Sequence, residues 1–303
     1  MKNILNQRAI YSVIYSLLIA GLSACGGGGS SNSSGTSKKS PQQDTATCTG
    51  AQISNVFSCI TIDERESISY IPTTVNEDTR IALFLHGAPG SANKVMNIFD
   101  AKAIADKHNF IVLAPEGNKS LYEWDSQNIP ADNANKDIDY ILALIDQVQA
   151  ENSQINTDLF VFGYSAGGFM AYKLACKIPE RISGIVSLAG QYRGDLEACS
   201  TATPVSIHHL HSPVDADVPY NGRSNGNIAS VDDTIALWKV KNGCSDLFTQ
   251  STGPGMTEGS DRTEHNTYDG CTHSLTLSIM SGVQHEADYQ ASQLMATYEY
   301  MFE

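Results

Sequence analysis

The segment Gly163-Tyr164-Ser165-Ala166-Gly167 carries the strongest chemical signal in the chain. It follows the apolar run 159–162 and opens a stretch with helical character, the strand-turn-helix context in which a nucleophilic serine occurs. Glycines at 163 and 167 suit such a sharp turn, because side chains there would clash with neighbouring elements. Ser165 would then present its hydroxyl at the positive end of the following helix. The alternative interpretation is a structural turn whose serine has no chemical role.

A nucleophilic serine needs a base and an acid that orients the base, and here both should follow the serine in the chain. His285, just after the last predicted strand, is the candidate base, because a neutral imidazole can take the serine proton. Asp215 and Asp217 lie in the loop where the orienting carboxylate belongs. The residues alone do not choose between these two aspartates. The remaining histidines near these strands are interpreted as ordinary sheet residues: His208, His209, His211 and His273.

The turn His86-Gly87-Ala88-Pro89-Gly90 follows an early apolar strand and can offer a backbone N–H to a developing oxyanion. Pro89 has no N–H, so Ala88 is the expected donor on this turn. Ala166, directly after the candidate nucleophile, would supply the second N–H. His86 is expected to tie the loop down rather than to act as a base. The sequence contains no CxxC spacing and no complete set of metal ligands, so a metal site is not expected. The predicted serine chemistry requires no cofactor.

Strands and helices that alternate along the chain must position these residues. Apolar runs predict strands at 81–85, 110–113, 159–162, 185–188, 205–211 and 273–280. Helical patterns occupy 92–107, 137–150, 166–177, 230–241 and 287–302. Short continuous apolar strands between helices predict an α/β fold with a mostly parallel sheet covered on both faces. We expect one catalytic domain over 47–303.

The N-terminus has the pattern of an export signal over residues 1–24. Lys2 and Arg8 precede the apolar run 9–22, which is too short to span a bilayer comfortably. The tetrapeptide 22–25 then resembles a bacterial lipobox, which predicts cleavage before Cys25 and acylation of that cysteine. Glycine rather than aspartate follows, which by resemblance to Gram-negative lipoproteins favours the outer membrane or cell surface. The Gly/Ser-rich segment 25–46 reads as a flexible tether, and the alternative is an ordinary signal peptide.

The cysteine count fits an exported chain. Of seven cysteines, assigning Cys25 to lipid leaves six, an even number that suits an oxidising compartment. Six cysteines allow fifteen pairings, and the sequence does not choose among them. Nearest-neighbour pairing is our expectation: Cys48–Cys59, Cys176–Cys199 and Cys244–Cys271. The alternative is that some are free, buried thiols.

The charge balance excludes one class of partner. The 303 residues contain 19 Lys and Arg against 33 Asp and Glu, a net charge of −14. Nucleic acid is therefore not an expected partner, because binding it requires phosphates to be neutralised. The acidic surface should also weakly repel highly anionic substrates.

From about Ser67 to the C-terminus the chain resembles the α/β-hydrolase esterases grouped with polyhydroxybutyrate depolymerases and with feruloyl and acetylxylan esterases. The resemblance rests on several segments together: 85–87, 163–171, 187–190, 211–220, Trp238 with 242–244, 270–271 and 279–285. It implies that the acid is the residue four positions after the loop histidine, Asp215, that the base is His285, and that Cys244 pairs with Cys271. There are two departures from the family pattern, Ser212 after the loop histidine and Glu286-Ala287-Asp288 after the base. They leave the triad candidates in place, and the family's substrate pocket is not implied for this chain.

These patterns predict a serine esterase without a cofactor that acts on short, soluble carboxylic esters outside the cytoplasm. The resemblance ranks hydroxybutyrate oligomers first, and feruloyl or acetyl esters of plant sugars second. A solid polymer is less expected, since no separate adsorption domain accompanies the catalytic one. Two other classes stay open: a peptidase or acyltransferase that uses the same triad, and a non-catalytic surface binding protein.

Overall fold

A ten-stranded sheet forms the centre of the computed structural model, which describes residues 46–118, 124–129, 135–199 and 201–303. The strand order is β10-β11-β12-β9-β8-β7-β5-β6-β4-β3. The strands from β12 to β6 in this order pair in parallel, and the outer pairs at both ends are antiparallel. The predicted α/β fold with a mostly parallel sheet is therefore confirmed.

The parallel strands follow the apolar runs of the sequence closely. The sheet strands are β3 (Ser58–Ile62), β4 (Arg65–Tyr70), β5 (Arg80–Leu85), β6 (Phe110–Pro115), β7 (Leu159–Tyr164), β8 (Gly184–Leu188), β9 (Ser206–His211), β10 (Phe248–Gly253), β11 (Thr263–Tyr268) and β12 (Leu275–Met280). A separate antiparallel pair consists of β1 (Ala46–Cys48) and β2 (Ala51–Ile53).

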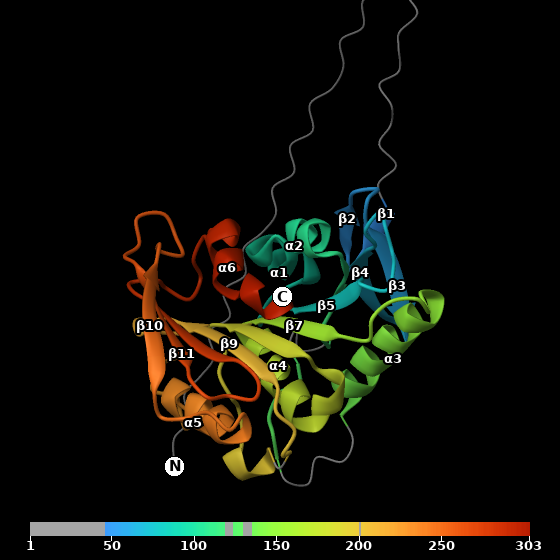
Figure 1. Cartoon of the computed structure of the whole chain (residues 1–303). Coiled ribbons are helices and arrows are strands. Elements are labelled where there is room, and N and C mark those ends of the chain that lie inside the picture. Colours follow the sequence, from blue (N-terminus) through green and yellow to red (C-terminus); the bar gives the residue numbers. More distant parts are fainter. Residues whose placement is uncertain (1–45, 119–123, 130–134, 200) are drawn as a thin grey trace, which may run out of the picture. The chain divides into compact units, whose positions relative to one another are not determined.

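Helices cover both faces of the sheet (Figure 1). On one side lie α1 (Ala92–Phe99), α2 (Ala101–His108) and α6 (Ala291–Tyr298), and on the other lie α3 (Lys136–Glu151), α4 (Ala166–Lys177) and α5 (Val231–Lys241). Short 3₁₀ turns occur at Pro179–Arg181, Leu196–Ala198 and Glu299–Phe302. Among the described residues, no helix has both the length and the apolar character needed to cross a membrane.

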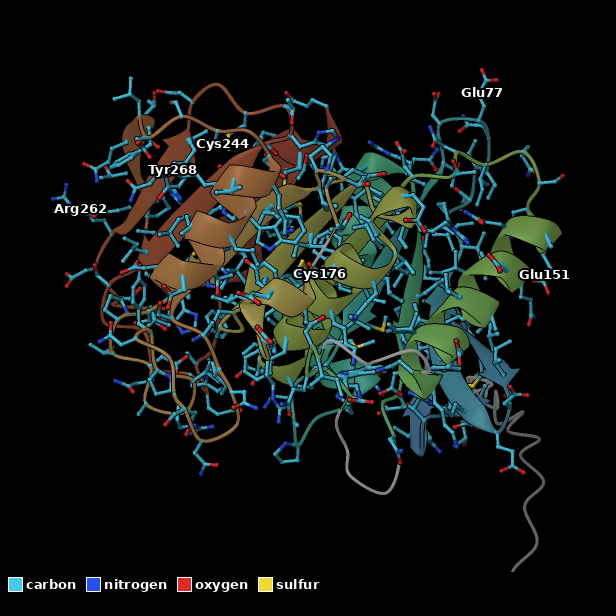
Figure 2. All side chains as sticks on the ribbon, turned by 90° about the horizontal axis from the view of Figure 1, so that it is seen from below. Glu77, Glu151, Cys176, Cys244, Arg262 and Tyr268 are labelled. Carbon is cyan, nitrogen blue, oxygen red and sulfur yellow. A yellow bond between two sulfur atoms is a disulfide. The ribbon has the colours of Figure 1, made fainter. Side chains whose placement is uncertain are left out.

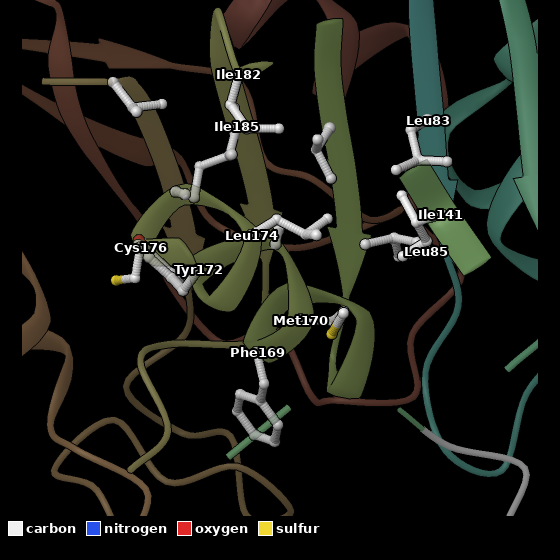
Figure 3. Close-up of a cluster of buried hydrophobic side chains, with 14 of the residues drawn as sticks. Leu83, Leu85, Ile141, Phe169, Met170, Tyr172, Leu174, Cys176, Ile182 and Ile185 are labelled. Atoms are coloured by element: carbon white, nitrogen blue, oxygen red, sulfur yellow. The ribbon is translucent and has the colours of Figure 1, made fainter. Parts of the chain in front are cut away.

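Each strand of the parallel region divides its side chains between two apolar cores, because successive residues point to opposite faces. In β5, Leu83 packs in one core with α3 and α4, while Phe84 packs in the other with α1 and α6. Figure 3 shows the first core, where Met170 and Leu174 of α4 lie close to the strands. Phe169, one residue earlier, belongs to the same buried core, but its ring points away from Leu83 and Ile185.

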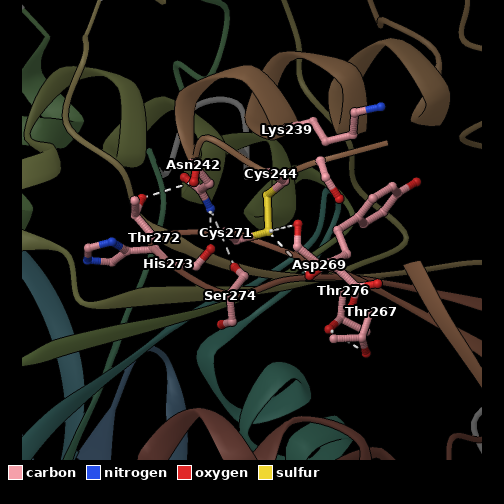
Figure 4. Close-up of a disulfide and its surroundings, with 12 residues drawn as sticks. Lys239, Asn242, Cys244, Thr267, Asp269, Cys271, Thr272, His273, Ser274 and Thr276 are labelled. Atoms are coloured by element: carbon pink, nitrogen blue, oxygen red, sulfur yellow. Dashed lines mark hydrogen bonds between the residues drawn. A yellow bond between two sulfur atoms is a disulfide. The ribbon is translucent and has the colours of Figure 1, made fainter. Parts of the chain in front are cut away.

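Three disulfides tie connecting segments to these elements: Cys48–Cys59, Cys176–Cys199 and Cys244–Cys271. This is the nearest-neighbour pairing that the sequence analysis favours. Cys176 lies among packed side chains, whereas Glu77, Glu151 and Arg262 point outward at the periphery (Figure 2). Beside Cys244–Cys271, the Asn242 side-chain amide donates to the carbonyl oxygens of His273 and Ser274 (Figure 4). The end of α5 is thereby fixed to the start of β12.

The structure corrects two helix predictions. The predicted helix 92–107 is two helices, because Asp100 adopts a left-handed conformation (φ 49°) and its carboxylate caps α2 by accepting the Ala103 N–H. The predicted helix 287–302 begins only at Ala291. Residues before it are held by tertiary contacts instead, since Thr257 bridges Tyr289 and the Gln290 N–H donates to the Met256 carbonyl.

Some predictions concern residues that the structure does not describe, and some strands of the structure were not predicted. The predicted signal peptide (1–24), Cys25 and nearly all of the tether (25–46) lie outside the described residues. The sequence analysis missed β1 to β4 and the β10–β11 hairpin, none of which belongs to the predicted strand-helix alternation.

Candidate active site

Ser165 occupies a strained turn between β7 and α4. Its backbone has φ 55° and ψ −118°, a conformation that costs a residue with a side chain about 1–3 kcal/mol. The two glycines make the turn possible. A Cβ at Gly163 would lie 2.3 Å from the Gly167 carbonyl oxygen, and a Cβ at Gly167 would lie 1.9 Å from the Leu85 carbonyl oxygen. Glycine at both positions therefore allows the sharp turn that places Ser165 beyond the end of the strand.

His285 reaches Ser165 from the loop that follows β12. Its Nε2 lies 2.8 Å from Ser165 Oγ, and both side chains are buried. The hydroxyls of Tyr164 and Tyr289 both donate to the His285 carbonyl oxygen, at 2.8 and 3.1 Å. The Tyr164 ring also stacks on the imidazole, with centroids 5.4 Å apart. These contacts fix the backbone and the ring plane of the candidate base.

Asp215, not Asp217, contacts His285. Asp215 Oδ2 lies 2.7 Å from His285 Nδ1, while its Oδ1 accepts the N–H groups of Val218 (2.8 Å) and Asp217 (3.0 Å). Burial by itself raises the pKa of Asp215, but the hydrogen bonds from His285 and Val218 outweigh it and leave this pKa below its ordinary value. The carboxylate therefore stays ionised at neutral pH. Asp217 is exposed and meets the triad only through its backbone.

The other histidines of these strands have structural surroundings. His211 Nε2–H donates to the Val218 carbonyl at 2.8 Å and so closes the loop that carries Asp215. Burial lowers the pKa of His211 and lowers that of His208 to about 3, which keeps both rings neutral. His209 is fully buried and contacts the Tyr172 hydroxyl. His273 is exposed and precedes β12, at the end of that strand opposite to His285.

The two expected oxyanion donors flank the serine. Ala88 and Ala166 line one cavity of about 400 Å³ together with Ser165 and His285. Within the described ranges, neither of their N–H groups donates to a protein acceptor, so both are available to a ligand oxygen. His86 holds the loop, since its Nδ1–H donates to the Gly87 carbonyl and its Nε2 accepts the Gly117 N–H.

The same cavity contains residues that the sequence analysis did not select: Phe169, Arg193 and Arg223. Phe169 falls within the segment 163–171, but the sequence analysis gave it no role of its own. The two arginines come from loops thirty residues apart, and no motif marks them. Their proximity to Ser165 is a product of tertiary structure alone.

The arrangement can perform acyl transfer. A hydroxyl hydrogen-bonded to a neutral imidazole, which an ionised carboxylate orients, is an activated nucleophile. The N–H groups of Ala88 and Ala166, two residues that line the same cavity, can stabilise the negative charge that develops on a carbonyl oxygen.

Comparison with known proteins supports this chemistry. Residues 68–229, more than half of the chain, match the phospholipase/carboxylesterase family, and the chain belongs to that family. Its resemblance to esterases of the α/β-hydrolase fold is therefore confirmed. Three curated relatives are a bifunctional acetylxylan esterase/xylanase of Neocallimastix patriciarum, a poly(3-hydroxybutyrate) depolymerase of Ralstonia pickettii and a probable feruloyl esterase C of Aspergillus flavus.

These relatives match over different lengths. The xylanase fusion is 25% identical over 50% of this chain and 21% of its own length, and the depolymerase is 30% identical over 42% and 28%. The feruloyl esterase is 24% identical over 73% of this chain and 76% of its own length. The chain thus spans less than half the length of the first two of these relatives, the acetylxylan esterase/xylanase and the depolymerase. An acetyl xylan esterase from Aspergillus awamori shares the fold, with a TM-score of 0.60 at 13% identity over 82% of this chain and 99% of that one.

Substitutions of the two aspartates test which of them orients His285. Asp215→Asn is expected to lower kcat/KM for a neutral aryl ester about 10³-fold or more, because an amide neither favours the productive tautomer of His285 nor stabilises its charged form. Asp217→Asn, the matched control two residues away, should change this value less than about threefold, since only its backbone contacts Asp215. Equal losses in both variants would contradict the assignment.

Proposed function

We propose that this protein is a serine esterase that hydrolyses short, soluble carboxylic esters through an acyl-enzyme on Ser165. The hydrogen-bonded series Ser165–His285–Asp215, with 2.8 and 2.7 Å between its members, is the observation that carries the proposal. Membership of the phospholipase/carboxylesterase family supports it independently.

The reaction follows from the geometry. His285 takes the proton from Ser165 Oγ as this oxygen attacks the ester carbonyl carbon, and Asp215 stabilises the resulting imidazolium. The N–H groups of Ala88 and Ala166 bind the oxyanion of the tetrahedral intermediate. The carbon–oxygen bond to the alcohol then breaks, and the alcohol leaves with the proton from His285. Water repeats the sequence on the acyl-enzyme and releases the acid.

The substrate ranking comes from the relatives and the size of the site. A cavity of about 400 Å³ at Ser165 can hold a short acyl or alcohol group. We propose hydroxybutyrate oligomers as the first class and feruloyl or acetyl esters of plant sugars as the second. The alignment over 73% of this chain with a probable feruloyl esterase favours the second class as a real alternative.

A panel of substrates tests this ranking. We expect kcat/KM to be highest on hydroxybutyrate dimers and trimers, lower on feruloyl and acetyl sugar esters, and lowest, per mole of enzyme, on a crystalline polyester. Release of product from each substrate can be followed by liquid chromatography. Faster release from the polyester than from the soluble oligomers would overturn the ranking, and cleavage of a peptide anilide without ester cleavage would indicate a peptidase. Binding without turnover of any ester would indicate a binding protein.

We propose further that the protein is exported and anchored by lipid on Cys25, in the outer membrane or at the cell surface. The three disulfides support export, because such bonds persist in oxidising compartments. Cys25→Ser is expected to release the protein from membrane fractions without changing its specific activity. Fractionation and the mass of the N-terminal peptide check this. A freely soluble wild-type protein without acyl mass would contradict it.

A further inference from the structure

Two guanidinium groups line the cavity that contains Ser165. Arg193 lies in the loop after β8 and is half-buried, whereas Arg223 lies in the loop between β9 and α5 and is exposed. Both are unexpected beside the nucleophile of a chain whose net charge is −14. The hydrogen-bond partners of each arginine show whether its charge is already paired with a carboxylate.

Arg193 is held in place without a carboxylate. Its Nε–H donates to the Gly226 carbonyl at 3.0 Å, and its Nη1–H donates to Ser126 Oγ at 3.2 Å. The guanidinium carbon lies 5.8 Å from the centroid of the Phe169 ring, which also lines the cavity. Within the described ranges, Nη2 has no protein acceptor. The side chain is therefore held in one orientation while its Nη2–H donors remain free for a ligand.

Arg223 has a similar set of partners. Its Nε–H donates to the Asn225 carbonyl at 3.1 Å, and its Nη1–H donates to the Asp217 carbonyl at 3.3 Å. In the part of the chain that the structure describes, neither arginine forms an ion pair with a carboxylate. Backbone carbonyls fix a guanidinium without neutralising its charge, so both positive charges remain available.

The cavity also contains two carboxylates, Glu286 and Asp217. Glu286 is engaged by Lys94, whose Nζ lies 2.6 Å from its Oε2, and this contact lowers the pKa of Glu286. Asp217 is exposed. Lys94 therefore pairs with Glu286, and Asp217 is the other carboxylate that lines the cavity beside the two arginines. With the ionised Asp215 beside His285 these charges balance, but the two arginines are the ones without a carboxylate partner in the described residues.

We propose that Arg193 and Arg223 form a subsite that binds a carboxylate of the substrate while Ser165 attacks its ester bond. The inference rests on the proposed esterase function and narrows its substrate class to esters with one free carboxylate. Guanidinium groups suit this role, because they offer paired N–H donors that match the two carboxylate oxygens. Such a carboxylate can belong to the acyl part, as in a half-ester of a dicarboxylic acid, or to the alcohol part, as in an oligomer of a hydroxy acid.

The surface next to the subsite limits the number of charges. A groove of about 750 Å³ shares Arg223 and Ile228 with the Ser165 cavity. Beyond the arginine, Asp195, Glu197 and Asp233 line this groove. A polyanion that continued along it would meet these carboxylates. The subsite therefore fits a single charged end, and the weak repulsion expected from the acidic surface applies to polyanions rather than to such an ester.

Matched pairs of esters test the subsite, and the measured quantity is the ratio of kcat/KM for the charged ester to that for the neutral one. The acyl arm compares 4-nitrophenyl hydrogen adipate with 4-nitrophenyl hexanoate. The alcohol arm compares the 3-hydroxybutyrate dimer with its methyl ester. Arg193→Gln is expected to lower the ratio about tenfold in the arm that uses the subsite, and Arg223→Gln about threefold, since an exposed charge is screened more strongly. The wild-type ratio should also fall as salt is added.

Arg181→Gln is the matched control. This arginine is paired with Asp146 and lines a surface cleft with His273, at the edge of the sheet opposite to Ser165. It should leave the ratio unchanged. Ratios that are the same in wild type, Arg193→Gln and Arg223→Gln in both arms would overturn the subsite while ester hydrolysis stands. Equal losses on charged and neutral esters would also overturn it, because they would mean a structural role. Absence of hydrolysis of the neutral esters by the wild type would instead overturn the esterase function.

Discussion

Replacing Ser165 with alanine is expected to lower kcat/KM for 4-nitrophenyl butyrate by about 10⁴-fold or more, because the members of a triad act as a unit. The substitution removes only Oγ, whose protein partner is His285 Nε2. The backbone of the turn is fixed separately by the Ser165 N–H, which donates to the Leu188 carbonyl at 2.9 Å. The thermal unfolding midpoint should therefore stay close to that of the wild type, and a scan of unfolding checks it.

Ser183→Ala is a matched control for this experiment. Ser183 precedes β8 at the opposite edge of the sheet, where its hydroxyl contacts Asp158. This variant should keep its esterase activity within about twofold. If Ser165→Ala retained more than about one-tenth of the wild-type activity, the nucleophile would have to be another residue.

The second large effect concerns the base. His285→Ala should lower kcat/KM for the same ester by a comparable factor of about 10⁴, because among the residues that the structure describes His285 is the hydrogen-bond partner of Ser165 Oγ that can take its proton. His273→Ala should change it less than about twofold, since His273 is exposed and lies at the other end of β12. Initial rates of both purified variants, with unfolding scans to show that each is folded, decide the matter. A greater loss in His273→Ala than in His285→Ala would contradict the assignment.

The sequence was sufficient to predict the parallel strands and three residues that the structure brings together, Ser165, His285 and Asp215. Runs such as 81–85 and 159–162 are apolar at every position because helices cover both faces, and this makes them easy to recognise. Ser165 directly follows such a strand, and His285 lies in the loop after the last strand, five residues beyond Met280, so the ends of the strands place both. Asp215 needed the spacing implied by the family resemblance, because composition alone does not distinguish it from Asp217.

The elements that were missed have weak patterns for physical reasons. Nearly all residues of β10 are exposed, and its sequence, Phe248–Gly253, has no apolar alternation to mark one buried face. The strands β1 and β2 have three residues each. The break between α1 and α2 depends on one aspartate in a left-handed conformation, and the late start of α6 depends on contacts with Met256 and Thr257. Such contacts are long-range and leave no local signal.

The two arginines of the Ser165 cavity could not be predicted from the sequence either. Arg193 and Arg223 are separated in sequence from each other and from Ser165, and each is surrounded by loop residues. Their orientation depends on the carbonyl oxygens of Gly226, Asn225 and Asp217, which the fold brings into position. A net charge summed over the whole chain does not indicate these two arginines, because it averages over a surface that is locally uneven.

The central claim is that Ser165 is the nucleophile, and covalent labelling tests it most directly. The wild-type protein is treated with a fluorophosphonate, digested with a protease and examined by mass spectrometry, with His285→Ala treated in parallel. A nucleophile activated by His285 should carry one phosphonyl adduct on Ser165 in the wild type, and the adduct should form far more slowly in His285→Ala. An adduct on any other serine, or equal labelling of both proteins, would contradict the account.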